Sequence, residues 1–313
     1  MTSAKAVWSR ILVATDGSEA ARPAEDCARD LAQVCGASLD LVSVVEFESW
    51  RDLSYDVNRL YLDARQREVR EALDEAAARL RVGDRPVTTH DPVGNPSQEI
   101  VALAASLPAD LVVLGTHGRT GLDHVLIGST AERVVRAATC DVLTIRAGVA
   151  HASVGESGAQ RKPPFQRLLV PVDFSDYSQA VVDAATRLAR GFGSLLTLLH
   201  IVEPIGYGVD FTIRHALSGS ALREDAERAL DQLVATCRAQ GVTAEGRVVP
   251  GLPTDAIVRA AEACESDAIV MGTHGRRGWS RLRFGSVAEA VVRQAGCPVI
   301  TVRCGDEARR QPS

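Results

Sequence analysis

Two glycine-rich segments have the residue types and spacing of a main-chain site for an anion. GTHGRTGLDHVLIGST runs from residue 115 to 130, and GTHGRRGWSRLRFGSV runs from 272 to 287. Each follows an apolar run, which ends at Leu114 or Met271. Because glycine has no Cβ, its backbone can approach a ligand closely and can adopt positive φ. A helix that starts after the third glycine adds unpaired amides and partial positive charge, which suit a phosphate.

An acidic side chain closes an earlier apolar run in each part of the chain. Asp16 ends RILVATD, and Asp173 ends RLLVPVD. In an open parallel sheet, ligands bind beyond the carboxyl ends of the strands, where the strand order reverses. A carboxylate at that edge can accept hydrogen bonds from a ribose or a base. The aspartates and the glycine-rich segments therefore predict a phosphate-bearing, nucleotide-like ligand at the strand ends.

A single offset of 157 residues aligns the two halves of the chain over their whole length. From 115 to 146, 18 of 32 positions are identical to those from 272 to 303. Repeats of this length are whole domains, because each has room for its own core. The landmarks that coincide are Asp16 with Asp173, Gly94 with Gly251, Pro96 with Pro253, Gly115 with Gly272, Gly118 with Gly275, Gly128 with Gly285 and Cys140 with Cys297.

The segment between the repeats has the composition of a linker. AGVAHASVGESGAQRKPP, from 147 to 164, is rich in small and polar residues, lacks periodicity and ends in a double proline. We therefore expect a first domain over residues 1–147, a linker over 148–164, a second domain over 165–305 and a polar tail over 306–313.

Strand and helix patterns alternate within each repeat. Short, continuously apolar strands between helices predict a parallel sheet that is covered on both faces, in a small doubly wound α/β domain. In the first repeat the expected strands are 10–16, 38–46, 87–94, 110–115 and 141–146, and the expected helices are 19–36, 56–82, 97–107 and 129–138. The second repeat shows the same order, with strands at 167–173, 194–203, 243–251, 267–272 and 298–303 and a long helix near 222–240.

Composition excludes several classes of protein. A net charge of −5 argues against a general nucleic-acid binder, and no apolar run approaches the ~20 residues of a membrane span. The N-terminal segment has no secretory pattern. The seven cysteines fit neither a CxxC motif nor a zinc pattern, so we expect reduced thiols in a cytoplasmic protein. Cys140 and Cys297 precede apolar strands, where burial is favoured over redox chemistry.

The spacing G-x2-G-x9-G-[ST] resembles the ATP-binding signature of the universal stress protein family. It occurs twice in this chain, together with the Gly-x-Pro-x-x-x-Ile turn and the first-strand aspartate. The resemblance covers nearly the whole chain. It implies two tandem Rossmann-like domains, similar to adenine nucleotide alpha hydrolases, each with a five-stranded parallel sheet of order 3-2-1-4-5. It also implies binding of ATP, alone or with Mg²⁺.

The resemblance also implies roles for individual residues. The first-strand aspartates would meet the sugar or the adenine edge, and the backbone at the end of the second strand would pair with adenine. The glycine-rich segments would hold ribose and phosphates, and no catalytic or metal-binding residue is implied. The residues given a binding role are Ala14, Asp16, Val44, Gly115, Thr116, His117, Gly118, Arg119, Gly128, Ser129 and Thr130, and in the second repeat Pro171, Asp173, Ile201, Gly272, Thr273, His274, Gly275, Arg276, Gly285, Ser286 and Val287.

Several of these residues have a simpler structural interpretation. Ser129 and Ser286 are each followed three residues later by glutamate, which is the pattern of a helix capping box. The glycines could be turn residues and the aspartates could be helix N-terminal acids. His117 and His274 could act as general bases, but no carboxylate or nucleophile stands at a matching spacing. The charged run from Arg65 to Arg81 is interpreted as a solvated helix face.

Three kinds of function are compatible with these patterns. The first is a nucleotide-dependent regulator of growth or survival under stress, acting through an unidentified protein partner. The second is a slow ATP hydrolase or phosphotransfer enzyme, for which the sequence lacks the Walker and kinase signatures. The third is a scaffold that binds no nucleotide, against which the intact glycines argue. Both sites are expected to bind, with unequal affinity, because LDHVLI in the first repeat is replaced by WSRLRF in the second.

The last strand of each repeat also predicts an assembly. DVLTIR and PVITVR would be edge strands, and an exposed edge favours pairing with another strand. The family resemblance implies pairing through this strand about a twofold axis. We therefore expect an intramolecular pseudo-dimer of the two repeats, and full chains could form a homodimer.

Overall fold

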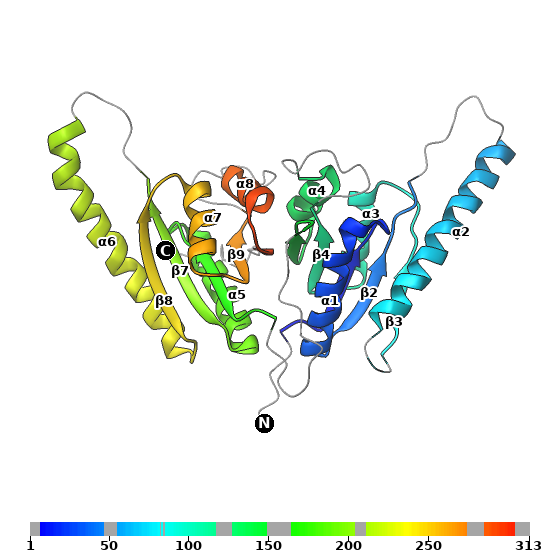
Figure 1. Cartoon of the computed structure of the whole chain (residues 1–313), viewed down its shortest axis with the longest axis horizontal. Coiled ribbons are helices and arrows are strands. Elements are labelled where there is room, and N and C mark those ends of the chain that lie inside the picture. The colour runs from blue at the N-terminus through cyan, green and yellow to red at the C-terminus, as the bar shows by residue number, and fades with distance from the viewer. Residues whose placement is uncertain are drawn as a thin grey trace, which may run out of the picture. The chain divides into compact units, whose positions relative to one another are not determined.

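The computed structural model describes residues 7–46, 55–81, 83, 85–116, 127–148, 164–203, 211–273 and 285–303. They form two compact units, which lie within Ala6–Ser153 and Val154–Ser313 (Figure 1). The division falls inside the segment that the sequence predicts to be a linker.

The first unit is a parallel five-stranded sheet of order β3-β2-β1-β4-β5. β1 is central, since Ile11 aligns with Leu39 of β2 on one side and with Leu111 of β4 on the other. The strands are β1 Arg10–Ala14, β2 Ser38–Val42, β3 Val87–His90, β4 Leu111–Gly115 and β5 Asp141–Ile145. The helices are η1 Glu19–Ala21, α1 Arg22–Cys35, α2 Tyr55–Leu80, α3 Pro96–Ser106 and α4 Ser129–Ala137.

The second unit repeats this topology, with the strand order β8-β7-β6-β9-β10. Numbered within the repeat, both sheets have the order 3-2-1-4-5, so the predicted fold class is confirmed. The strands are β6 Arg167–Pro171, β7 Leu195–Val202, β8 Ala244–Pro250, β9 Ala268–Gly272 and β10 Val299–Val302. The helices are α5 Asp176–Phe192, α6 Phe211–Ala239, α7 Pro253–Ala263 and α8 Ser286–Gln294.

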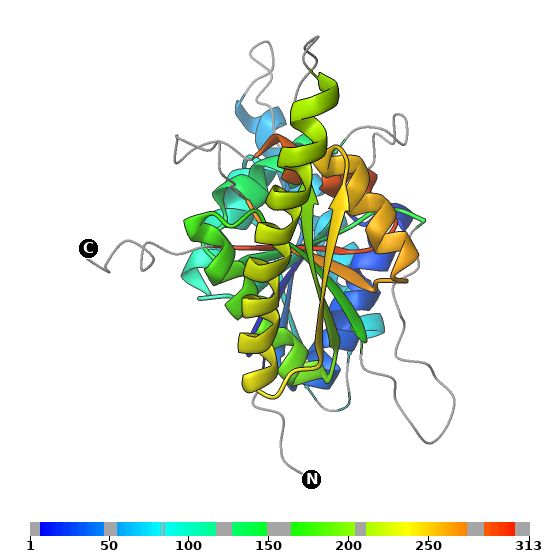
Figure 2. The same ribbon diagram turned by 90° about the vertical axis from the view of Figure 1, so that its left-hand side faces the viewer.

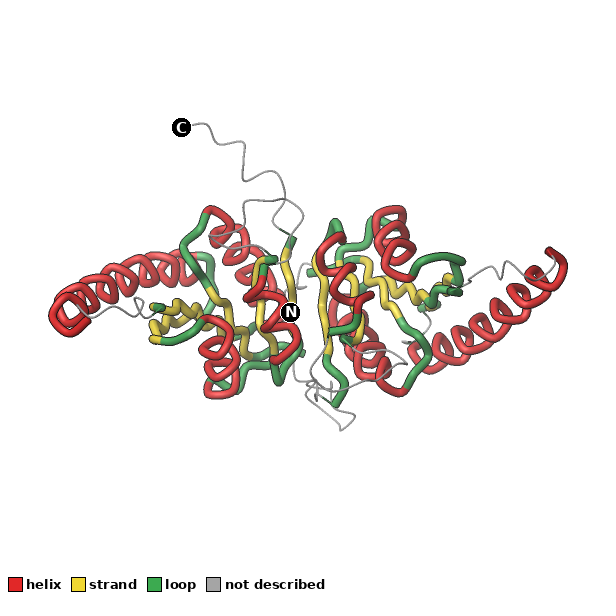
Figure 3. The backbone as a smooth tube through the Cα atoms, turned by 90° about the horizontal axis from the view of Figure 1, so that it is seen from above, coloured by secondary structure: helices red, strands yellow, loops and turns green. Residues whose placement is uncertain are grey.

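Helices cover both faces of each sheet (Figure 3). α1 contacts α2, and α3 contacts α4, as right-handed crossovers on either side of β1 require. The central strands are therefore buried on both faces, and Ile11, Leu12 and Val13 have no exposed surface. Burial of each such side chain contributes roughly 1.5–3 kcal/mol. The core thus fixes the ends of β1 and β4, where the candidate site begins.

The long charged helix is confirmed, and its apolar residues follow the side that meets the sheet. Val69, Leu73 and Leu80 of α2 are buried, at a spacing that keeps them on one face of a helix. Nearer the start of α2, Leu60 and Tyr61 are exposed, and this end of the helix extends past its sheet in Figure 1. In the second unit, α6 runs along β7 and β8 in the same way (Figure 2).

The second strand of the first unit is shorter than predicted. β2 ends at Val42, whereas the apolar run suggested a strand to residue 46. Val45 forms an isolated bridge to Val93, so the chain stays extended beyond the strand. β7 in the second unit does continue, to Val202. Val44 therefore lies two residues past its strand, while Ile201 lies within one.

Candidate functional site

The turn after β1 positions the first of the predicted residues, Asp16. Its Oδ1 accepts a hydrogen bond from the Ser18 amide at 3.0 Å, and the Gly17 amide donates to Thr15 Oγ1 at 3.0 Å. Gly17 has φ 75°, a conformation that glycine adopts without steric cost. The turn therefore holds the Asp16 carboxylate at the carboxyl end of the central strand.

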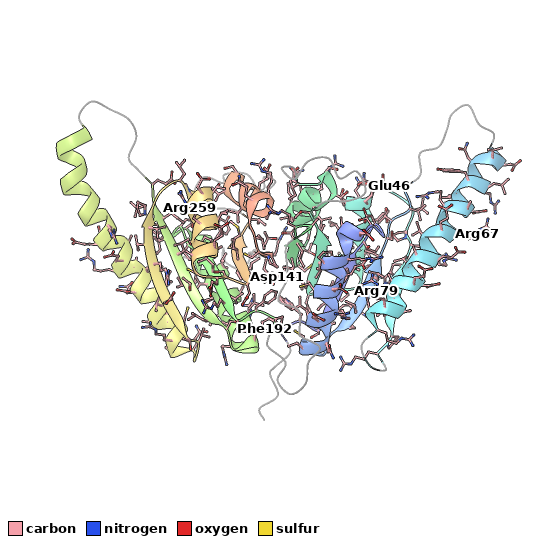
Figure 4. The ribbon with its side chains drawn as sticks, in the orientation of Figure 1. Glu46, Arg67, Arg79, Asp141, Phe192 and Arg259 are labelled. Atoms are coloured by element: carbon pink, nitrogen blue, oxygen red, sulfur yellow. The ribbon has the colours of Figure 1, made fainter. Side chains whose placement is uncertain are left out.

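A salt bridge to a buried carboxylate supports this turn. Thr15 Oγ1 donates to Glu25 Oε1 at 2.5 Å, and Glu25 of α1 is 1% exposed. Arg79, from the last turn of α2, forms a salt bridge to the same carboxylate and is labelled in Figure 4. The charge of Glu25 is thus paired, as burial requires. These contacts connect the β1 turn to both helices on this face of the sheet.

The extended chain beyond β2 presents an uncovered main-chain edge. The amides of Ser43 and Val45 donate to the carbonyls of His90 and Pro92, at 3.1 and 2.8 Å, on the β3 side. Because successive residues of a strand point their backbone groups in opposite directions, the N–H and C=O of Val44 face the β1 side. β1 ends at Ala14, which pairs with Val42, so this strand does not extend to the level of the predicted adenine-pairing group.

A pocket that opens to solvent lies between the β1 turn and α2. It is shallow, with a cavity volume of about 60 Å³. α2 contributes Arg65 and Glu68, whose side chains form a salt bridge at 2.5 Å. The sequence interpretation of this run as a solvated face missed these two residues. The pocket is lined by Thr15, Asp16, Gly17, Ser43, Arg65, Glu68, Val69, Ala72, Leu73 and Ala76.

The glycines after β4 close a second side of the site. The Thr116 amide donates to Ile145 at 2.9 Å, and the Gly128 amide donates to the Thr116 carbonyl at 2.7 Å. A Cβ on Gly128 would lie 3.1 Å from that carbonyl oxygen, which is tighter than ordinary contact, so a side chain here would need Thr116 to shift. The same bond joins Gly285 to Thr273 at 2.9 Å in the second unit. The amide of this glycine is therefore engaged within the protein.

The start of α4 contradicts the capping-box interpretation. Gly128 is the N-cap and makes no side-chain capping bond, and Ser129 is the first helical residue. Ser129 is exposed, and no described residue accepts a hydrogen bond from the amides of Ser129 or Thr130. α8 begins in the same way, with Gly285 as N-cap and Ser286 first. These helix starts retain the amides that attract an anion.

The remaining predicted residues fall into two groups. Ala14 is the last residue of β1, and Pro171 is the last residue of β6. The predicted residues outside the described part of the chain are His117, Gly118, Arg119, His274, Gly275 and Arg276. Arg281 and Arg283, the two arginines of the WSRLRF segment that is expected to make the two affinities unequal, lie outside it too. Within the described residues, no cluster of three or more His, Cys, Asp or Glu could hold a metal ion.

In each half the fold is a doubly wound α/β domain, and in the first half a pocket lies at the strand where the order reverses. The chain belongs to the universal stress protein family. The model of the Universal stress protein family matches residues 8–146 and 164–303. This membership supports a role in the stress response. None of the described helices is long and apolar enough to cross a membrane.

Individual relatives agree with this assignment. A universal stress protein of Methanocaldococcus jannaschii is 31% identical over 140 residues, which are 44% of this chain and 82% of that protein. One of Mycobacterium tuberculosis is 30% identical over 201 residues, or 62% of each chain. The crystal structure of a universal stress protein from Archaeoglobus fulgidus superposes with a TM-score of 0.70 over 96% of this chain and 98% of its own. At 20% identity, that likeness supports the fold alone.

Proposed function

We propose that this chain is an ATP-binding regulator of the stress response. The observation that carries the proposal is the convergence, at the end of β1, of three different kinds of group. Asp16 follows β1, which lies between β2, whose continuation holds Val44, and β4, which leads into Thr116, so these chain ends open at the same edge of the sheet. β1 is also the strand at which the sheet order reverses, where α/β sheets bind ligands.

The three groups suit the three parts of ATP. The N–H and C=O of Val44 would pair with the adenine edge, and Asp16 would accept from ribose hydroxyls. The triphosphate would extend toward Gly115 and Thr116 and toward the amides at the start of α4, which donate to no described residue. A helix start favours an anion through its partial positive charge. Because the Gly128 amide already donates to Thr116, the proposed role of this glycine is to let the start of α4 lie close to the end of β4.

The backbone groups of Val44 would give the site a preference for adenine over guanine. A backbone C=O accepts from the adenine amino group, and the neighbouring N–H donates to a ring nitrogen. Guanine reverses donor and acceptor at the corresponding positions. Each hydrogen bond contributes about 1 kcal/mol, so loss of two predicts a preference for ATP over GTP of roughly 10- to 100-fold.

Regulation would arise through α2. Arg65 and Glu68 line the pocket beside Asp16, so an occupant of the crevice would contact the same helix that extends past the sheet. ATP occupancy would then alter the surface that α2 offers to a protein partner. The described cysteines are free thiols, in keeping with a proposed cytoplasmic role.

The proposed assembly concerns the last strand of each repeat. β5 and β10 each stand at one end of the five-strand order of their own unit. We propose that these edges pair within one chain, so that the two repeats form a pseudo-dimer. Size measurement of the full chain distinguishes this arrangement from a dimer of chains.

The proposal is tested by identifying the nucleotide that the protein carries and binds. Mass spectrometry of the purified chain should find an adenine nucleotide. Isothermal titration with ATP, ADP, AMP and GTP should rank ATP above GTP, with and without Mg²⁺. Absence of saturable binding of all four would overturn the proposal.

A further inference from the structure

The side chain of Thr15 holds the turn around Asp16 in shape. The Gly17 amide donates to Thr15 Oγ1 at 3.0 Å, which closes the turn around Asp16. The same hydroxyl donates to Glu25 Oε1 at 2.5 Å. An ionised carboxylate only accepts hydrogen bonds, so the hydroxyl proton points to Glu25 and a lone pair remains for the Gly17 amide. Glu25 therefore fixes the direction of both hydrogen bonds.

Glu25 also connects this turn to the last turn of α2. It is 1% exposed, and its second oxygen, Oε2, accepts from Arg79 Nη2 in a salt bridge. Nη1 of the same arginine lies 3.4 Å from the carboxylate of Asp26, the next residue of α1. The guanidinium is a rigid fork that is always charged, so it fixes the end of α2 against α1. The contacts from Thr15 through Glu25 to Arg79 are called the relay below.

The relay begins and ends beside the same pocket. Thr15 lines the pocket from the β1 turn, and Leu73 and Ala76 line it from α2. Ala76 precedes Arg79 by three residues, which is less than one helical turn. A ligand that restricts the turn around Asp16 would therefore also restrict the end of α2, beyond the residues that it could touch.

The second unit replaces all three members of the relay. At the offset of 157 residues, the residues that stand at these positions are Val172, Val182 and Thr236. The two valines are buried and have no polar side-chain atom, and Thr236 Oγ1 donates to the Gln232 carbonyl within α6 at 2.9 Å. These residues cannot form the same connection. The three positions differ together, as expected for residues that act as one unit.

The turn of the second unit is supported by a different helix. Ser178 of α5 donates from its Oγ to Asp173 Oδ1 at 2.8 Å, and Ala21 takes its place in the first unit. The support of Asp173 therefore comes from the helix that directly follows the turn. In the first unit the support of Asp16 comes through Glu25, which is bonded to α2 as well.

We infer that Glu25 is a positioning residue of the first site, and that it links occupancy of this site to the last turn of α2 through Thr15 and Arg79. The inference rests on the proposed function and deepens it, because it identifies the contacts through which a bound nucleotide acts on α2. A nucleotide that binds Asp16 restricts the Thr15 hydroxyl, and the relay passes this restriction to Arg79. Removal of the hydroxyl interrupts the link but leaves the wall of the pocket on α2.

The test compares amide hydrogen exchange of the full chain with and without ATP, read by mass spectrometry. In the parent, saturating ATP should slow exchange in peptides that cover residues 77–80 by roughly 3-fold or more. Thr15→Val, which introduces the residue of the second unit, should abolish this effect, and Thr15→Ser, which keeps the hydroxyl, should retain it. Arg70→Thr is the control, because its salt bridge to Asp91 at 2.7 Å connects α2 to the end of β3 outside the relay.

The ATP affinity of the variants provides a second readout. Thr15→Val and Arg79→Thr should each lower it by roughly 3- to 10-fold. The double variant should lose no more than the larger single loss, because both changes interrupt one relay. Thermal melting identifies the temperature at which each variant is folded. If Arg79→Thr does not fold, the comparison of Thr15→Val with Thr15→Ser still decides.

Three results would overturn the inference while leaving the proposed function intact. They are ATP binding by the parent without slower exchange at residues 77–80, slower exchange that persists in folded Thr15→Val at saturating ATP, and affinity losses that add in the double variant. Absence of ATP binding by the parent would overturn both.

Discussion

The Gly128 amide donates a hydrogen bond of 2.7 Å to the Thr116 carbonyl. This bond brings the end of the loop after β4 back to its beginning. The helix start at Ser129 is thereby placed beside the end of the strand. A side chain at this position would crowd the bond, because a Cβ on Gly128 would lie 3.1 Å from the same oxygen and Thr116 would have to shift.

Gly128→Val should therefore weaken ATP binding and destabilise the first unit modestly. The backbone has φ −61°, which valine tolerates, so the cost comes from the contact with Thr116. Overpacking of this kind costs about 1–3 kcal/mol. Urea unfolding and ATP titration measure the two effects. Gly296→Ala is a control, since its added Cβ would meet nothing within 4 Å. Equal ATP affinity of Gly128→Val and the parent would contradict the assigned role of this glycine.

Asp16→Asn should lower the affinity for ATP while preserving the turn. The amide side chain still offers an oxygen to the Ser18 amide, which Oδ1 now accepts at 3.0 Å. It lacks the negative charge that strengthens hydrogen bonds from ribose hydroxyls. We expect a loss of roughly 10-fold, or about 1.4 kcal/mol, and a melting temperature close to that of the parent. A folded variant with parental affinity would show that Asp16 does not meet the nucleotide.

Arg79→Met should destabilise the first unit by leaving Glu25 buried without its cation. Glu25 is 1% exposed and also accepts from Thr15. Removal of one partner of a buried pair costs about 3–5 kcal/mol, and the partial exposure of Arg79 reduces this to roughly 2 kcal/mol. Chemical denaturation measures the change. Glu25→Gln added to Arg79→Met should recover much of it, and no recovery would indicate that Arg79 acts through packing alone.

The thiols of Cys140 and Cys297 should react slowly in the folded protein. Burial, helped by Asp141, raises the pKa of Cys140 to about 11. Burial, helped by Asp267, raises the pKa of Cys297 to about 12. At pH 8 only about one thousandth of a thiol with pKa 11 is the reactive thiolate. Iodoacetamide labelling, read by mass spectrometry, should accelerate as pH rises toward 11 and on unfolding in urea. Rapid labelling of either thiol in the folded chain at pH 8 would contradict this.

The same pKa shifts give the stability of the protein a definite pH dependence. In the unfolded chain these thiols ionise near their usual 9.0, whereas in the folded chain they hold their protons to higher pH. The folded state therefore binds more protons between pH 9 and 11, and its free energy of unfolding should fall as pH rises through this range. Replacement of both cysteines by alanine should reduce that slope.

The fold could be predicted because its signals are local and repeated. Continuous apolar strands such as Leu111–Gly115 allow little besides a buried parallel sheet, and the offset of 157 residues duplicates every landmark. The glycine spacing predicted a close backbone approach at Gly128 to a ligand, whereas the structure shows its amide bonded to the Thr116 carbonyl.

The parts of the site that could not be predicted from the sequence depend on tertiary packing. Arg65 and Glu68 have the spacing of an ordinary solvated helix face, and only the packing of α2 over the β1 turn makes them pocket residues.

The most direct test of the account is photolabelling of the full chain with 8-azido-ATP, followed by peptide mapping. The account predicts saturable labelling of peptides from the first unit that contain the β1 turn at Thr15–Ser18, the β2 edge at Ser43–Glu46 or the pocket face of α2. Excess ATP should remove the label, and Gly128→Val should reduce it. Labelling that ATP does not compete for, or labelling confined to peptides outside this crevice, would contradict the account.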